Sequence, residues 1–138
     1  MVKIIDMQDI RHLNLFGKIT QVQTRFCFKY NNTLIFCVPY PLLHKAVGEN
    51  GKNVQKMKEV LRKKIRIVAK PRGIQDAKNF IESIVNPIKI KETNINGDEI
   101  IINTMRQNKA SLIGRDKRRL KEMQVIVKDF FGKDVRII

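Results

Sequence analysis

The feature that most constrains the fold of this chain is an internal repeat. The segment AVGENGKNVQKMKEVL, which begins at Ala46, matches LIGRDKRRLKEMQVIV, which begins 66 residues later at Leu112. Leu34-Ile35-Phe36 falls on Ile100-Ile101-Ile102 at the same offset. Solenoid repeats have periods of about 20–50 residues, so a period of this length describes a whole folding unit. The sequence therefore predicts two copies of one small domain, residues 1–71 and 72–138, with the boundary at Pro71-Arg72-Gly73.

Both copies show the same order of hydrophobic patterns. Each begins with a helical pattern, continues with a strand hairpin and two helices separated by a glycine turn, and ends with a β-branched strand. The expected first helices span 7–16 and 75–85, the hairpins 25–38 and 88–104, and the closing strands 65–69 and 135–138. We therefore predict an α+β fold of two tandem α-β-β-α-α-β units, each a three-stranded sheet packed on one face by helices.

The charge of the chain predicts a polyanionic partner. There are 28 Lys and Arg against 13 Asp and Glu, a formal net charge of +15, while 43% of the residues are apolar. A chain that can bury a core and still carries this excess is a folded basic protein, and nucleic acid is the first candidate partner. An anionic membrane is the weaker alternative, because the longest apolar runs are far shorter than a membrane span. Asp6 and Asp9 interrupt any signal-peptide pattern, so we expect a cytoplasmic protein with no membrane partner.

The cysteines and histidines predict no metal or disulfide. A two-residue turn at Asn31-Asn32 pairs residue 26 with 37 and 27 with 36. Cys27 and Cys37 then lie on opposite faces of the hairpin, so we expect two reduced thiols. His12 and His44 have no partners at zinc spacing, and we expect both at the surface or at helix ends. No metal site and no cofactor is expected.

The glycine turn of copy one has the composition of a phosphate clamp. Gly48 and Gly51 let the backbone turn sharply and approach a ligand closely. The amides at the start of the following helix carry the positive end of its dipole, and Lys52 and Lys56 add full charges beside it. The predicted nucleic-acid-binding residues of copy one are Gly48, Glu49, Asn50, Gly51, Lys52, Asn53 and Lys56.

Copy two departs from this pattern, because Lys117 stands where the second glycine belongs. A side chain there is expected to narrow the approach to the amides and to shift the loop toward an ordinary helix start. Copy two should then contribute mainly positive charge. Whether it binds nucleic acid is left open by the sequence. Its candidate residues are Gly114, Arg115, Asp116, Lys117, Arg118 and Arg119.

These residues resemble the KH domain, whose GxxG loop between two helices clamps a single-stranded nucleic acid. The order of elements is similar to the type II form, and the tandem pair resembles the NusA-like transcription factors of archaea. The resemblance implies single-stranded RNA as the ligand, a role in transcription elongation, termination or antitermination, and RNA polymerase or the transcription complex as a candidate partner. A ribosome-associated or RNA-processing KH protein is the alternative. We expect a monomer.

An enzyme is the main rival class, because Gly51-Lys52 beside a glycine turn is similar to part of a nucleotide-binding P-loop. The spacing does not fit. A Walker motif has four residues between its glycines and a Ser or Thr after the lysine, whereas two residues intervene here and Asn53 follows. The sequence shows no Ser-His-Asp or Cys-His arrangement, so we expect no catalytic residues.

Overall fold

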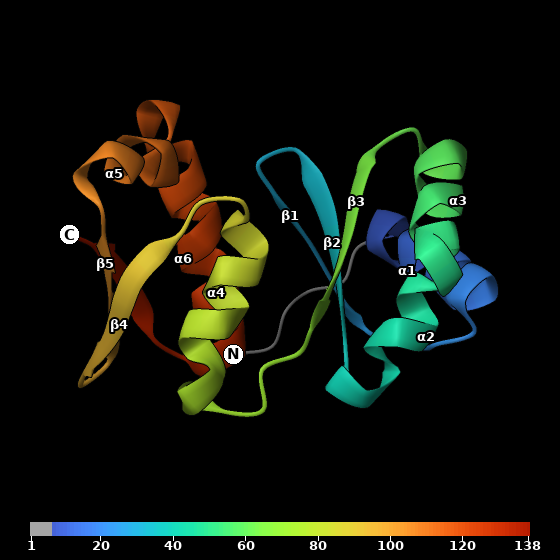
Figure 1. Cartoon of the computed structure of the whole chain (residues 1–138), viewed down its shortest axis with the longest axis horizontal. Helices are drawn as coiled ribbons and strands as arrows, with labels where there is room; N and C mark the ends of the chain where they lie inside the picture. Colours follow the sequence, from blue (N-terminus) through green and yellow to red (C-terminus); the bar gives the residue numbers. More distant parts are fainter. Residues whose placement is uncertain (1–6) are drawn as a thin grey trace. The chain divides into compact units, whose positions relative to one another are not determined.

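The structure is a computed structural model that describes residues 7–138. The chain has an α+β architecture with two three-stranded sheets (Figure 1). It divides into two compact units between Lys70 and Pro71. This division falls one residue before the predicted boundary.

The first unit follows the predicted order of elements, with its helices on one face of the sheet (Figure 1). The order in the sheet is β1-β2-β3, with β1 and β2 antiparallel and β2 and β3 parallel. Phe26 pairs with Cys37 and Cys27 with Phe36, as the turn predicts. The elements are α1 (Met7–Thr20), β1 (Phe26–Tyr30), β2 (Thr33–Val38), α2 (Leu43–Val47), α3 (Lys52–Leu61) and β3 (Lys64–Ala69).

Helix α1 extends four residues beyond the predicted end at residue 16. Phe16 and Thr20 are both buried, because they lie one turn apart on the face toward the sheet. The Thr20 hydroxyl donates a hydrogen bond of 2.7 Å to the Phe16 carbonyl. The Phe16 ring stacks on Phe36 of β2 with a centroid separation of 4.4 Å. Met57 of α3 is fully buried in the same core. This packing holds α1 and α3 against the sheet.

The second unit repeats the topology. Its sheet has the order β4-β5-β6, with the first pair of strands antiparallel and the second parallel. The buried residues Ile100, Ile102, Leu112 and Met123 lie 66 positions after Leu34, Phe36, Ala46 and Met57, which are also buried. The elements are α4 (Ala77–Val85), β4 (Ile90–Asn96), β5 (Glu99–Thr104), α5 (Arg106–Ile113), α6 (Arg118–Phe131) and β6 (Asp134–Ile137).

The repeat gains about one helical turn in its last helix. Helix α3 has 10 residues and α6 has 14. Thr33 pairs with Lys64 in unit one, and Glu99 pairs with Asp134 in unit two, so the offset grows from 66 to 70 between these strands. Four residues are close to the 3.6 of one turn, so the insertion keeps the same helix face toward the sheet.

The start of the second unit is held by an ion pair. The backbone N–H and the Nε of Arg72 donate to the Asp76 carboxylate, at 2.9 and 3.0 Å. The side-chain hydrogen bond from Arg72 lowers the pKa of the Asp76 carboxyl. These bonds fix the turn at residues 74–76 that precedes α4.

Candidate nucleic-acid interface

The copy-one loop has a backbone that favours glycine at two positions. Gly48 ends α2 with φ 82° and ψ 162°, and its N–H donates to the His44 carbonyl at 2.9 Å. Asn50 (φ 55°, ψ 27°) and Gly51 (φ 73°, ψ 20°) follow in the left-handed region. The Gly51 N–H donates back to the Gly48 carbonyl at 3.0 Å. The chain therefore reverses within four residues and enters α3 directly.

The copy-two loop has the same backbone, so the prediction that Lys117 shifts its dihedral angles was wrong. Gly114 has φ 76° and ψ 171°, Asp116 has φ 55° and ψ 28°, and Lys117 has φ 60° and ψ 24°. The Lys117 N–H donates to the Gly114 carbonyl at 3.2 Å. Lys117 adopts the left-handed conformation because the turn requires it, and its side chain is exposed. Both units thus present one loop geometry.

The space around each glycine explains why only the second one is replaced. A Cβ on Gly48 would lie 2.9 Å from Asn53 Cγ, and a Cβ on Gly114 would lie 2.9 Å from Arg119 Cγ. At Gly51 no atom lies within 4 Å of the corresponding position. The first glycine is therefore required by both conformation and contact. The second position only has to accept a positive φ, which Lys117 does.

Asn53 and Arg119 each make hydrogen bonds that connect the two helices on either side of a loop. The Asn53 side-chain amide donates to the Lys45 and Ala46 carbonyls, at 3.2 and 3.1 Å. At the equivalent place in copy two, an Arg119 guanidinium N–H donates to the Ser111 carbonyl at 3.0 Å. Each bond joins the start of one helix to the end of the preceding one. The sequence placed both residues among the RNA contacts, whereas in the structure these donors bind carbonyls of the helix that precedes each loop.

The remaining predicted residues lie at the surface around the loops. Lys52 and Lys56 line a hollow of about 520 Å³ with Lys18, Ile19 and Asn53. The side chains of Glu49, Asn50, Arg115, Asp116, Lys117 and Arg118 are exposed. Within residues 7–138, ion pairs join Arg72 to Asp76, Lys128 to Asp134 and Arg136 to Glu99, and these three do not use a loop cation.

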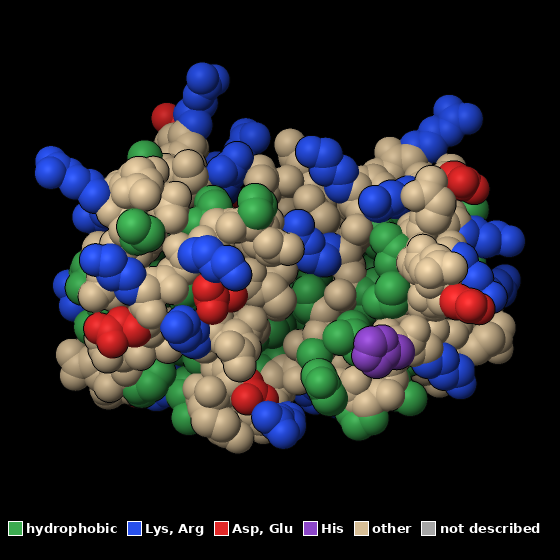
Figure 2. Space-filling view, viewed as in Figure 1, with side chains coloured by type: hydrophobic (Ala, Val, Ile, Leu, Met, Phe, Trp, Pro, Cys, Tyr) green, Lys and Arg blue, Asp and Glu red, His purple; other side chains and the backbone are tan. Residues whose placement is uncertain are grey.

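The surface charge and the helix ends give the loops a positive potential. Lys and Arg side chains outnumber Asp and Glu on the face shown in Figure 2. Gly51 and Lys117, which precede α3 and α6, make no side-chain cap to these helices. The helix N-termini therefore direct their partial positive charge to the loops, where an anion is stabilised.

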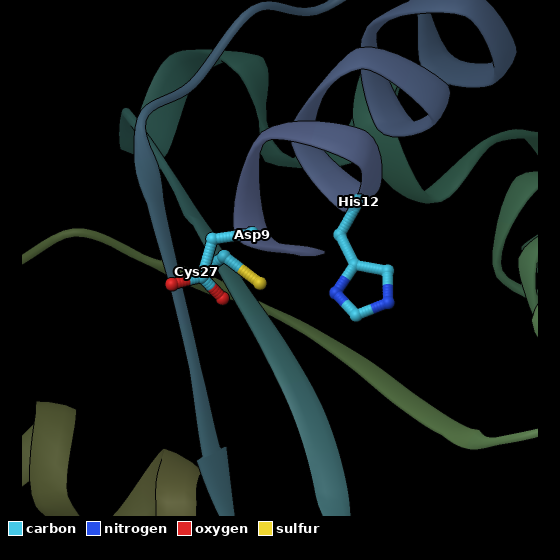
Figure 3. Close-up of side chains that lie close together, drawn as sticks. All are labelled: Asp9, His12 and Cys27. Carbon is cyan, nitrogen blue, oxygen red and sulfur yellow. The ribbon is translucent and has the colours of Figure 1, made fainter. Parts of the chain in front are cut away.

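The sequence did not predict the group formed by Asp9, His12 and Cys27. His12 is buried, with 6% of its surface exposed, so the prediction of a surface or helix-end residue was wrong. It lies beside Asp9 and Cys27 (Figure 3). Cys27 and Cys37 are both free thiols, as predicted, and both are buried. No zinc spacing exists in the sequence because Cys27 comes from a strand, fifteen positions after His12.

Comparison with known proteins identifies the fold only. Neither a family model nor a curated protein matches the sequence. Among solved structures, the chain is similar to the crystal structure of APE1850, with a TM-score of 0.67 and 23% identity, covering 97% of this chain and 100% of that chain. At this identity, the likeness shows that the two proteins share a fold, and it shows nothing about function. In the described part of the chain, residues 7–138, none of the helices has the length and apolar character needed to cross a bilayer.

Proposed function

We propose that this chain is a single-stranded RNA-binding protein built of two tandem type II KH units, similar to the NusA-like transcription factors of archaea. The observation that carries the proposal is the pair of loops with one backbone geometry, 66 residues apart, each between two helices and each surrounded by exposed cations. In this proposal the protein is a cytoplasmic monomer without catalytic activity. It acts in transcription elongation, termination or antitermination.

Copy one binds the sugar-phosphate backbone in this proposal. The turn at Gly48 and Gly51 brings the backbone of the loop to the surface, where no Cβ on either glycine hinders a phosphate. The start of α3 supplies partial positive charge, and Lys52 and Lys56 supply full charges. The role of Asn53 is to position the loop through its bonds to α2.

Copy two takes part in binding as well. Its loop does not shift toward an ordinary helix start, because Lys117 keeps the left-handed conformation of Gly51. Arg115, Lys117 and Arg118 are exposed and contribute phosphate contacts. Asp116 offsets part of this charge. Contacts to phosphate position the nucleic acid without reading its bases, so copy two is expected to bind with little sequence preference.

The salt dependence of binding tests the RNA proposal. If about 4–6 phosphates are neutralised, log K for single-stranded RNA should fall against log salt with a slope of about −3 to −4. Single strands should bind more tightly than duplex RNA, and anionic vesicles should compete only weakly. Fluorescence anisotropy at several salt concentrations measures all three. A slope near zero, or equal affinity for duplex RNA, would contradict the proposal.

The site of action is tested by co-purification from the native cell. A tagged full-length chain is expected to recover RNA polymerase after nuclease treatment, which removes proteins held only through shared RNA. An untagged strain is the control. Recovery of ribosomal subunits instead would contradict the transcription role and favour the ribosome-associated or RNA-processing alternative, without affecting the assignment of RNA binding.

A further inference from the structure

Three side chains able to bind a metal ion meet between α1 and β1 in the first unit (Figure 3). Asp9 and His12 are three positions apart on α1, so they lie on one face of the helix. Cys27 is on β1, the strand next to that helix. One potential ligand atom of each lies within 4.8 Å of the others. Among residues 7–138 this is the one group of three such residues so close together.

Two of the three side chains in this group are buried. His12 is 6% exposed and Cys27 is 2% exposed, whereas Asp9 is half-buried. Cys27 also belongs to the apolar core of the unit, together with Phe16 and Phe36. The imidazole and the thiol are thus shielded from bulk water, and Asp9 is the side from which an ion can reach the group.

We propose that Asp9, His12 and Cys27 form a binding site for one borderline divalent cation, with Zn²⁺ as the preferred ion. Zinc accepts imidazole, thiolate and carboxylate together, whereas the thiolate disfavours Mg²⁺ and Ca²⁺. Three protein ligands leave the fourth tetrahedral position to water, which enters beside half-buried Asp9. The site joins the first turn of α1 to β1, and it is independent of the RNA proposal.

The three ligand atoms must move slightly closer together to bind a zinc ion. Tetrahedral zinc bonds of about 2.0–2.3 Å place ligand atoms about 3.3–3.8 Å apart. The three atoms here lie within 4.8 Å of one another, so the gap to be closed is at most about 1–1.5 Å. Rotation of side chains closes such a gap, and Asp9 is the least buried of the three. Binding displaces the thiol proton to the solvent, because the thiolate is the ligand.

Cobalt titration of the full-length chain tests the site. The protein is first freed of bound nucleic acid in high salt, because phosphates also bind divalent ions. Co²⁺ is expected to give a thiolate-to-metal charge-transfer band and the visible bands of tetrahedral cobalt at one ion per chain. Zn²⁺ should abolish both. A wild-type protein without the charge-transfer band, or with only the weak spectrum of octahedral cobalt, would overturn the proposal.

Matched variants assign the ligands. Cys27→Ala and Cys37→Ala each remove one buried thiol from adjacent strands of one sheet. Cys27→Ala should abolish the charge-transfer band and Cys37→Ala should retain it. Asp9→Asn, at a half-buried position, should weaken Zn²⁺ binding more than about tenfold, since even the loss of an outer-shell partner costs roughly 10–100-fold. If Cys27→Ala does not fold, the Zn²⁺ affinity of Asp9→Asn alone tests the site. Retention of wild-type Zn²⁺ affinity by Asp9→Asn, or of the band by Cys27→Ala, would refute the assignment.

Discussion

Gly48→Ala is expected to lower the free energy of unfolding by about 2–4 kcal/mol. Gly48 has φ 82° and ψ 162°, a conformation that residues with a Cβ rarely adopt, and this alone costs about 1–3 kcal/mol. The new Cβ would also lie 2.9 Å from Cγ of Asn53, whose amide is bound to the Lys45 and Ala46 carbonyls. Asn53 must therefore shift, which weakens these bonds. Urea denaturation monitored by circular dichroism measures the loss in the free energy of unfolding.

The same substitution at the other glycine of the loop is the matched control. Gly51→Ala meets no atom within 4 Å and requires only the left-handed conformation, so it should cost only about 1–2 kcal/mol. Lys117→Gly reverses this change in copy two. It relieves the left-handed lysine but adds chain entropy to the unfolded state, so stability should stay within about 1 kcal/mol of wild type. Equal losses for Gly48→Ala and Gly51→Ala would show that contact with Asn53 has no importance.

The first glycine of the copy-two loop, Gly114, leaves even less room for a Cβ than Gly48 does. A Cβ on Gly114 would lie 2.9 Å from Arg119 Cγ and 3.1 Å from the Arg119 backbone nitrogen, which cannot rotate away. The requirement for glycine at the first position is therefore common to both units. The requirement at the second position is only conformational, and this explains how the chain carries Lys117 there without losing the turn.

The order of elements and the register of the first hairpin were predictable because they depend on local signals. Hydrophobic periodicity marks each helix and strand, and a two-residue turn at Asn31-Asn32 fixes the pairing of Phe26 with Cys37. The repeat then transfers each assignment from one copy to the other. The extra turn of α6 was not recognised as an insertion, because a heptad-like pattern continues unbroken through it.

The interior of the loops could not be predicted from residue type alone. Asn53 and Arg119 differ in charge and length, yet each donates to a carbonyl near the end of the preceding helix. The conformation of Lys117 follows from the turn as a whole, whereas its residue type favours an ordinary helix start. The group of Asp9, His12 and Cys27 depends on the packing of α1 on β1, a tertiary contact without a sequence spacing.

The second large effect expected is a loss of RNA affinity when the copy-one loop gains negative charge. Glu49→Asp combined with Asn50→Asp places two carboxylates on short side chains next to the proposed phosphate site. Asn50→Asp adds the one new negative charge, and Glu49→Asp keeps a carboxylate on a shorter side chain. At about 6 Å and an effective dielectric constant of about 40, the added charge opposes a phosphate by about 1.4 kcal/mol, or tenfold in affinity. The fold should be unaffected, because Asp116 already occupies the position equivalent to Asn50 with φ 55°. Anisotropy with a short single-stranded RNA measures the change.

Two variants distinguish the effect of charge in the loop on RNA affinity from the effect of the net charge of the chain. Glu49→Gln removes the carboxylate that the loop already carries and should tighten binding. Asn32→Asp adds a carboxylate at another exposed residue with positive φ, in the β1–β2 turn. That turn lies next to Thr33, which pairs with Lys64 after the end of α3, whereas the loop precedes α3. The 10 residues of α3 span about 15 Å, so screening at physiological salt should leave Asn32→Asp close to wild type. If Asn32→Asp weakened RNA binding as much as the loop variant, the positive potential of the whole chain would be responsible, and the assignment of the loop would be wrong.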